Sequence, residues 1–128
     1  MPEAITSFKE VIHQGTHYPF YGLDSRIYLW KSYFEYMDHL TSEEVDDMHR
    51  LYDPFRLYID RNTKISPLHR LQYRNFVRLF KRFVRILEAE NGQNDPSALP
   101  AFQAELEEQN DVANKTWFAQ KVAESISQ

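Results

Sequence analysis

The chain has 128 residues, of which 42% are apolar and 27% charged, with a formal net charge of −4 and a pI near 5.7. This composition is typical of one ordinary globular domain, and it excludes a disordered chain that cannot build a core. The sequence contains no cysteine, which excludes disulfides, thiolate metal sites and cysteine nucleophiles. We expect a cytoplasmic protein without a membrane segment, because no stretch reaches the roughly 20 apolar residues that span a bilayer.

Three helical segments are expected in the N-terminal half. Apolar residues spaced three and four apart predict a short helix before Gly15 and a second helix that begins at a cap formed by Asp24 or Ser25. Residues 41–44, TSEE, have the form of a capping box, which predicts the start of a third helix. Pro54 interrupts the apolar stripe of that helix, so the segment is either two helices or one kinked helix.

The C-terminal half opens with a strong helix-start signal. Ser66 is a cap-type residue, and Pro67 after it suits the first helical position. The pattern that follows predicts a long amphipathic helix over about 67–91, because Asn91 and Gly92 form a typical helix stop.

The remaining residues complete a helical fold. The segment 91–100 is the candidate for an internal linker, since it combines glycine, asparagine and two prolines. The apolar pattern after it predicts a C-terminal helical hairpin over 101–128. We therefore expect an all-α fold, a compact helical bundle of five to seven helices in a single domain over residues 1–128.

The long helix predicted over 67–91 divides into a basic face and an apolar face. At about 100° per residue, its basic side chains fall within an arc of about 120°, and most apolar side chains, Leu68 among them, occupy the opposite side. Leu71 is the one apolar residue inside the basic arc. The basic face is defined by six residues, which are also the candidate binding residues: Arg70, Arg74, Arg78, Lys81, Arg82 and Arg85.

The basic face concentrates like charges that need compensation. Between Arg50 and Arg85 ten basic residues meet only two acidic ones, which gives +8 there and −12 in the rest of the chain. Four like-charge pairs spaced four residues apart along the face cost roughly 1–2 kcal/mol in sum at low salt. Either an external anion or acids of the same chain can offset this cost. The acids in question are Glu43, Glu44, Asp46, Asp47, Glu105, Glu107, Glu108 and Asp111.

Five of the six residues of the basic face are arginines, whose planar fork suits bidentate contact with carboxylates and phosphates. The leading hypothesis is a non-enzymatic helical interaction module that docks an anionic surface of a macromolecular partner, either another protein or a second copy of the chain. The alternative is nucleic-acid binding, to DNA or RNA, by the same face, although a pI near 5.7 is low for such a protein. A third interpretation is a face that is merely solvated or covered by the chain's own acids.

Motifs for catalysis and metal binding are missing from the sequence. It has no glycine-rich phosphate loop and no nucleophile elbow. A distant alternative is a small helical metal protein or enzyme around His13, His17, Glu35 and His39, but these residues lack the paired Glu-x-x-His motifs of di-iron sites. We therefore expect no enzymatic activity, no cofactor, no metal site and no small-molecule substrate.

Aromatic residues cluster in the N-terminal half, with eight rings between residues 18 and 36. Aromatic rings bury large areas, so packing into the core is the leading interpretation. The alternative is an exposed aromatic strip around Tyr28 and Tyr36, because tyrosine is enriched at the positions that dominate protein interfaces.

Overall fold

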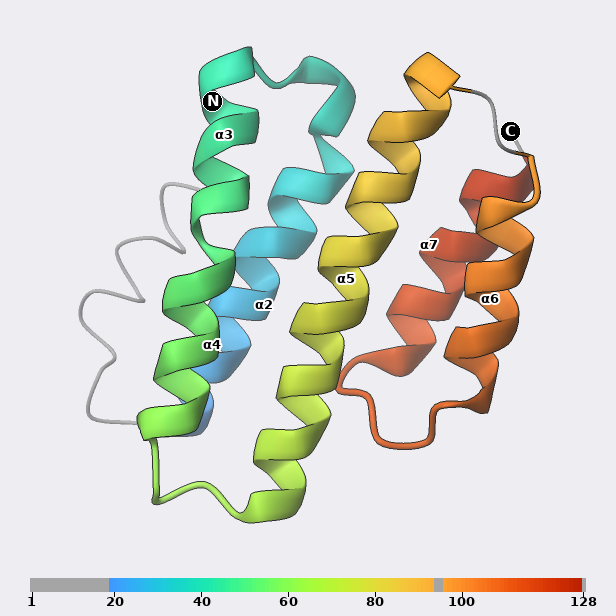
Figure 1. The fold of residues 1–128 in the computed structure, drawn as a ribbon. Helices are drawn as coiled ribbons and strands as arrows, with labels where there is room; N and C mark the ends of the chain where they lie inside the picture. Colours follow the sequence, from blue (N-terminus) through green and yellow to red (C-terminus); the bar gives the residue numbers. More distant parts are fainter. Residues whose placement is uncertain (1–18, 94–95, 128) are drawn as a thin grey trace. The chain divides into compact units, whose positions relative to one another are not determined.

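The computed structural model describes residues 19–93 and 96–127, and all regular elements in these ranges are helices (Figure 1). In chain order they are α2 (Pro19–Glu35), the short 3-10 helix η1 (Met37–His39), α3 (Ser42–Arg50), α4 (Tyr52–Arg61), α5 (Pro67–Gln93), α6 (Ala98–Glu108) and α7 (Lys115–Ser127). The predicted all-α fold is confirmed. No helix in the described ranges combines the length and the apolar character needed to cross a membrane. The helix predicted before Gly15 lies outside the described residues.

The described helices form two compact units, with α2 to α4 in the first and α5 to α7 in the second. The boundary falls between Ser66 and Pro67, at the predicted helix start. Helix α5 continues to Gln93, two residues past the predicted end, and α6 begins at Ala98. The single domain over residues 1–128, with its linker and C-terminal hairpin, stays a prediction.

Helix α2 begins at Pro19, so the start predicted at Asp24 or Ser25 is wrong. Proline suits the first turn of a helix, because its missing N–H would have no helical partner there. Ser25 lies inside α2 and is buried. A cap-type residue in the sequence is therefore not sufficient evidence for a helix start.

In the first unit, α3 packs against α2 and α4, and Trp30 of α2 is almost fully buried. The centroid of its ring lies 5.0 Å from that of Tyr52 and 4.8 Å from that of Phe55, both on α4. The burial of Trp30, and of Tyr33 on the same helix, confirms core packing as the role of part of the aromatic cluster. Tyr28 and Tyr36 are about half exposed, as the alternative interpretation expected of them.

A capping box starts α3, as predicted. Thr41 Oγ1 accepts a hydrogen bond from the Glu44 amide at 3.2 Å, and Glu44 Oε1 accepts one from the Thr41 amide at 3.1 Å. Helix α3 ends at Arg50 and α4 begins at Tyr52, so the segment around Pro54 is two helices. Pro54 stands in the first turn of α4, where its missing N–H breaks no helical hydrogen bond.

A close contact between α2 and α4 depends on Gly22. Arg26 Nη1 donates a hydrogen bond to the Gly22 carbonyl at 3.0 Å, and the guanidinium carbon lies 3.7 Å from the centroid of the Tyr58 ring. A Cβ atom at position 22 would meet the Tyr58 hydroxyl and lie 3.0 Å from Tyr58 Cζ. The Tyr58 ring therefore occupies the space that any side chain at position 22 would need.

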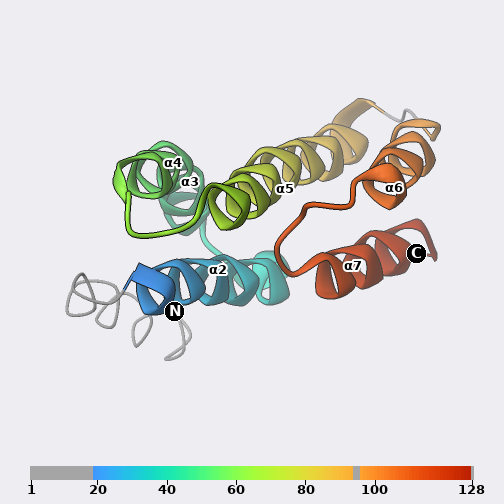
Figure 2. The ribbon, with the colours of Figure 1, turned by 90° about the horizontal axis from the view of Figure 1, so that it is seen from below.

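In the second unit, α5, α6 and α7 pack against one another (Figure 2). Phenylalanine side chains fill the space between these helices. The ring centroid of Phe118, on α7, lies 5.6 to 6.0 Å from those of Phe76, Phe80, Phe83 and Phe102. All five side chains are at most 2% exposed. Aromatic pairs at these distances add to the free energy gained from burial, so this cluster is the core that joins the three helices.

The connection between α6 and α7 is hydrogen-bonded to α5. The Ala113 amide donates a hydrogen bond to the Gln72 carbonyl at 3.0 Å, and Asn75 Nδ2 donates one to the Asp111 carbonyl at 2.9 Å. At the end of this connection, the Lys115 ammonium donates to two carbonyls at the C-terminal end of α6, where a positive charge is favourable. The two hydrogen bonds at Gln72 and Asn75 tie the connection to the first half of α5.

Candidate docking face on α5

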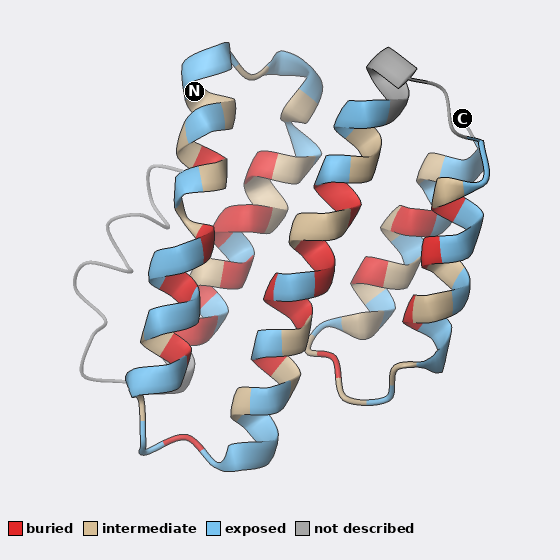
Figure 3. Cartoon of the chain, in the orientation of Figure 1, coloured by how far each residue is buried: buried red, intermediate tan, exposed pale blue. Residues whose placement is uncertain are grey.

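The basic face lies along α5, where buried and exposed residues alternate (Figure 3). Three of its six residues are half-buried: Arg70, Lys81 and Arg82. The other three are exposed: Arg74, Arg78 and Arg85. The opposite side of α5 carries the phenylalanines of the core, so the division into an apolar face and a basic face is present in the folded helix.

Arg82 is engaged in a contact inside the second unit. Its Nη1 and Nη2 lie 2.6 Å and 2.8 Å from Oε1 and Oε2 of Glu105 on α6, which makes a bidentate ion pair. The guanidinium carbon also lies 5.5 Å from the centroid of the Phe102 ring. The hydrogen bonds from Arg82 hold the pKa of Glu105 below its ordinary value, and the same bonds raise the pKa of Arg82. One residue of the basic face is thus neutralised by an acid of the same chain.

Arg78 and Arg85 are open to an external anion, and we call them the open arginines. Both are exposed, and within the described part of the second unit no residue forms a hydrogen bond or an ion pair with either side chain. The charge of Arg78 lowers the pKa of Glu105 without direct contact. Arg74 is also exposed and extends the same surface by one helical turn. The exposed positive charge of the basic face therefore comes from three side chains, rather than from the six that the sequence indicated.

Two of the other acids considered as cover for the basic face, Glu44 and Asp47, have side-chain contacts within their own segment. Asp47 pairs with Arg50 at 3.0 Å within α3. Asp111 contacts α5 through its main-chain carbonyl, which accepts the hydrogen bond from Asn75. Four more of these acids are exposed: Glu43, Asp46, Glu107 and Glu108. Among the described residues of the second unit, an acid pairs with Arg82, and none pairs with the open arginines.

Two apolar residues at the start of α5 are exposed beside the basic face. Leu68 is 53% exposed and Leu71 is 40% exposed. The position of Leu71 inside the basic arc was a signal of its exposure, whereas Leu68 belongs to the apolar arc and gave no such signal. The first phenylalanine of the core, Phe76, comes about two turns after Leu68, so the start of α5 extends beyond that core.

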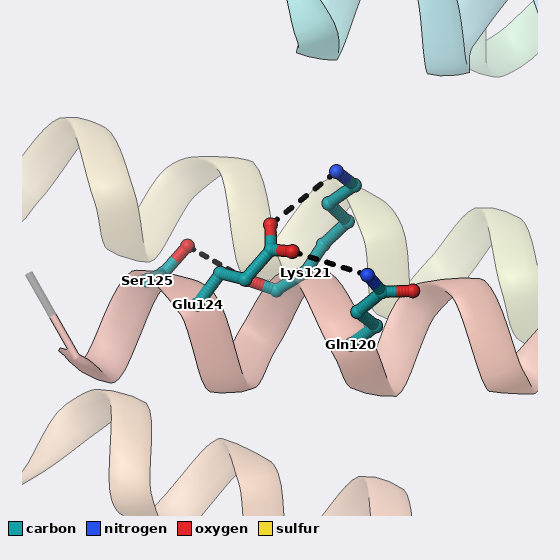
Figure 4. A network of polar contacts seen from close by, with 4 residues as sticks. All are labelled: Gln120, Lys121, Glu124 and Ser125. Carbon is teal, nitrogen blue, oxygen red and sulfur yellow. Dashed lines mark hydrogen bonds and ion pairs between the residues drawn. The ribbon is translucent and has the colours of Figure 1, made fainter.

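A second group of polar side chains lies on α7 (Figure 4). Glu124 accepts a hydrogen bond from Gln120 Nε2 at 3.2 Å and pairs with Lys121 Nζ at 3.3 Å. Ser125 Oγ donates a hydrogen bond to the Lys121 carbonyl at 2.9 Å. These contacts join residues three to four apart on one helix, so they are ordinary helix-surface pairs that stabilise α7 locally.

The residues of the distant metal-site alternative are not brought together in the described part of the chain. Within residues 19–93 and 96–127, no group of three His, Asp or Glu side chains could hold a metal ion. His13 and His17 lie outside these ranges, and Glu35 and His39 are exposed.

Comparison with protein-family models, with curated proteins and with solved structures finds no match for the chain.

Proposed function

We propose that the chain is a non-enzymatic, cytoplasmic interaction module that docks an anionic surface of a protein partner through α5. The observation that supports this proposal is the position of the open arginines on a helix whose opposite face is buried. The guanidinium of Arg82 already donates two hydrogen bonds to Glu105. An exposed guanidinium, in contrast, can form a bidentate contact with a carboxylate of a partner. A cysteine-free chain fits the cytoplasmic compartment.

Helix α5 is held in place by packing and by hydrogen bonds, which supports docking by a preorganised surface. The phenylalanine core holds one side of the helix, and the hydrogen bonds at Gln72 and Asn75 hold its first half. A partner that binds a rigid helix loses less conformational freedom than one that must order a loop. The exposed arginines therefore need to order only their own side chains on binding.

The structure favours protein carboxylates over nucleic acid as the anion. Three exposed basic residues are few for a nucleic-acid site, and the chain outside residues 50–85 carries a net charge of −12 that repels a long polyanion. If nucleic acid were bound through these three residues, the slope of log K against log salt for duplex DNA would be at most about −3. Nucleic-acid binding is thus a measurable competing outcome.

The test compares two matched double reversals of charge. Arg78→Glu with Arg85→Glu changes the open arginines, and Arg56→Glu with Arg61→Glu changes two exposed arginines of α4. Binding of a fluorescein-labelled poly-glutamate peptide, and of labelled DNA and RNA oligonucleotides, is measured by anisotropy at several salt concentrations. We expect the α5 reversal to weaken peptide binding at least tenfold at low salt and the α4 reversal to leave it within about twofold.

Two results would contradict the proposal. The first is an α5 double reversal that is more stable than the parent chain and still binds the peptide, since this marks the face as merely solvated. The second is tight binding of oligonucleotides, with the salt dependence given above, in the absence of peptide binding. In that case the alternative interpretation, nucleic-acid binding, is the correct one.

A further inference from the structure

The exposed side of α5 carries a continuous strip that is apolar at one end and basic along the rest. We call it the α5 strip, and it consists of Leu68, Leu71, Arg74, Arg78 and Arg85. At about 100° per residue the five members span an arc of about 120°, from Arg74 to Leu68, so Leu68 lies where the basic side of the helix meets its apolar side. At 1.5 Å per residue, the strip is about 26 Å long.

The two leucines of the α5 strip are a distinct feature of the surface. Leu68 and Leu71 are three residues apart and are 53% and 40% exposed. A single exposed apolar residue is ordinary, but two adjacent ones that continue into a row of arginines form a patch of mixed chemistry. Near the leucines, the Gln72 carbonyl accepts a hydrogen bond from the α6–α7 connection and Asn75 donates one to it, but both leucines stay exposed.

We propose that the α5 strip binds an acidic amphipathic helix of a partner protein, whose apolar residues cover Leu68 and Leu71 and whose carboxylates meet the arginines that follow. This inference rests on the proposed function and names the chemistry of the partner. Charge complementarity selects carboxylates for the basic part, and the exposed leucines select apolar side chains at one end. A nucleic-acid duplex presents phosphates along its whole length and keeps its base faces stacked inside, so its charge does not give way to an apolar surface at one end of the strip.

A second copy of the chain is a poorer fit to the α5 strip. Its exposed large apolar residues outside the strip include Leu57 on α4, which has Asp53 and Asp60 within one turn. Arg56 and Arg61 stand on the same short helix and are exposed, so the acidic character of that surface is cancelled. We therefore assign the strip to a different protein.

The experiment uses two labelled helical peptides of about 18 residues, the length that matches the strip. In the segregated peptide, two leucines occupy the first turn. Three glutamates follow at successive spacings of three, four and seven residues, as the arginines of the strip follow Leu71. In the mixed peptide, which has the same composition, the leucines stand between the glutamates. We expect the full-length chain to bind the segregated peptide about tenfold more tightly than the mixed one.

Variants of the chain separate the apolar end from the basic part. Leu68→Ala with Leu71→Ala should weaken binding of the segregated peptide about tenfold and leave binding of poly-glutamate unchanged. The matched control is Leu57→Ala, since Leu57 is 42% exposed and lies outside the strip. It should change neither affinity. Alanine keeps the helix propensity of each position, and the unfolding transition of each variant verifies its fold.

Equal affinity for the two peptides, together with an unchanged affinity in the leucine variant, would overturn the strip proposal but leave the proposed function standing. If the α5 charge reversal also left all peptide binding intact, the proposed function would fail as well. Three more results overturn the strip proposal. The first is that the chain binds neither peptide at low salt. The second is a dimer of the chain, detected by light scattering, that the two leucine substitutions abolish, and the third is binding of the chain to vesicles of anionic phospholipid instead of to the peptides.

Discussion

The ion pair between Arg82 and Glu105 can be measured with a double-mutant cycle of Arg82→Ala and Glu105→Ala. The two side chains are 42% and 38% exposed, so solvent screens the pair, and its bidentate geometry places it near the upper end of the range of about 0.2–1 kcal/mol for exposed pairs. Arg82→Ala also removes the contact with Phe102, which contributes about 0.5–1 kcal/mol more at an exposed site. We expect a loss of about 1–2 kcal/mol for Arg82→Ala and a coupling free energy of about 0.5–1 kcal/mol.

The coupling free energy between Arg82 and Glu105 should decrease as the pH is lowered. Arg82 lowers the pKa of Glu105 in the folded chain, so the ionised carboxylate is the form that stabilises the fold. The contribution is fully present above the ordinary pKa of a glutamate, about 4.3, and it is lost as the pH falls through the lowered pKa of the folded state. The coupling measured at neutral pH should therefore fade in acid, and the single variant Glu105→Gln should show a weaker dependence of stability on pH than the parent chain.

The assay is urea unfolding of the four proteins of the cycle, followed by circular dichroism at pH 7 and at the lowest pH at which all four still fold. Binding of the segregated peptide is measured on the same proteins. Arg82→Ala should keep its peptide affinity within about twofold, because Arg82 is not a member of the α5 strip. A coupling free energy of zero at pH 7, or a tenfold loss of peptide binding on removal of Arg82, would refute the assignment of this arginine to an internal contact.

Three further predictions concern stability. Phe118→Ala should lower the free energy of unfolding by about 3–5 kcal/mol in urea, because its ring contacts four others, whereas exposed Ile126→Ala should change it by at most about 0.5 kcal/mol. Gly22→Ala should cost about 1–3 kcal/mol, and Tyr58→Phe in the same chain should recover part of that loss; an equal loss in both backgrounds refutes the clash. Thr41→Ala should lower the thermal midpoint by removing a cap worth about 1 kcal/mol, and an unchanged midpoint would contradict the capping role.

Features that depend on neighbouring residues could be predicted from the sequence. The capping box joins residues three apart, and the start of α5 needs only a cap-type residue followed by proline. The basic face is likewise a property of one helix, since its residues are periodic whatever packs on the other side. The start of α2 was missed because Pro19, Asp24 and Ser25 each carry a local signal for a helix start, and local signals alone do not rank them.

Features that depend on packing between helices could not be predicted in the same way. Glu105 lies 23 residues from Arg82, and the two meet only because α6 packs on α5. The sequence indicated eight acids of the chain as candidates to neutralise the basic face, but it could not select the one that pairs. The exposure of Leu68 also depends on where the core ends along α5. The docking function and its six candidate residues stay predictions that the binding experiments test.

The contact between Gly22 and Tyr58 has a consequence for how this chain can vary in evolution. Because the tyrosine ring fills the space beside the glycine, the two positions are linked. A homologue that carries a side chain at the first position must carry a smaller residue at the second, or its α4 must move away from α2. Arg26 depends on both, since it bonds to the glycine carbonyl and stacks on the ring. These three positions should therefore change together across homologous sequences, whereas the exposed arginines of α4 should vary independently of them.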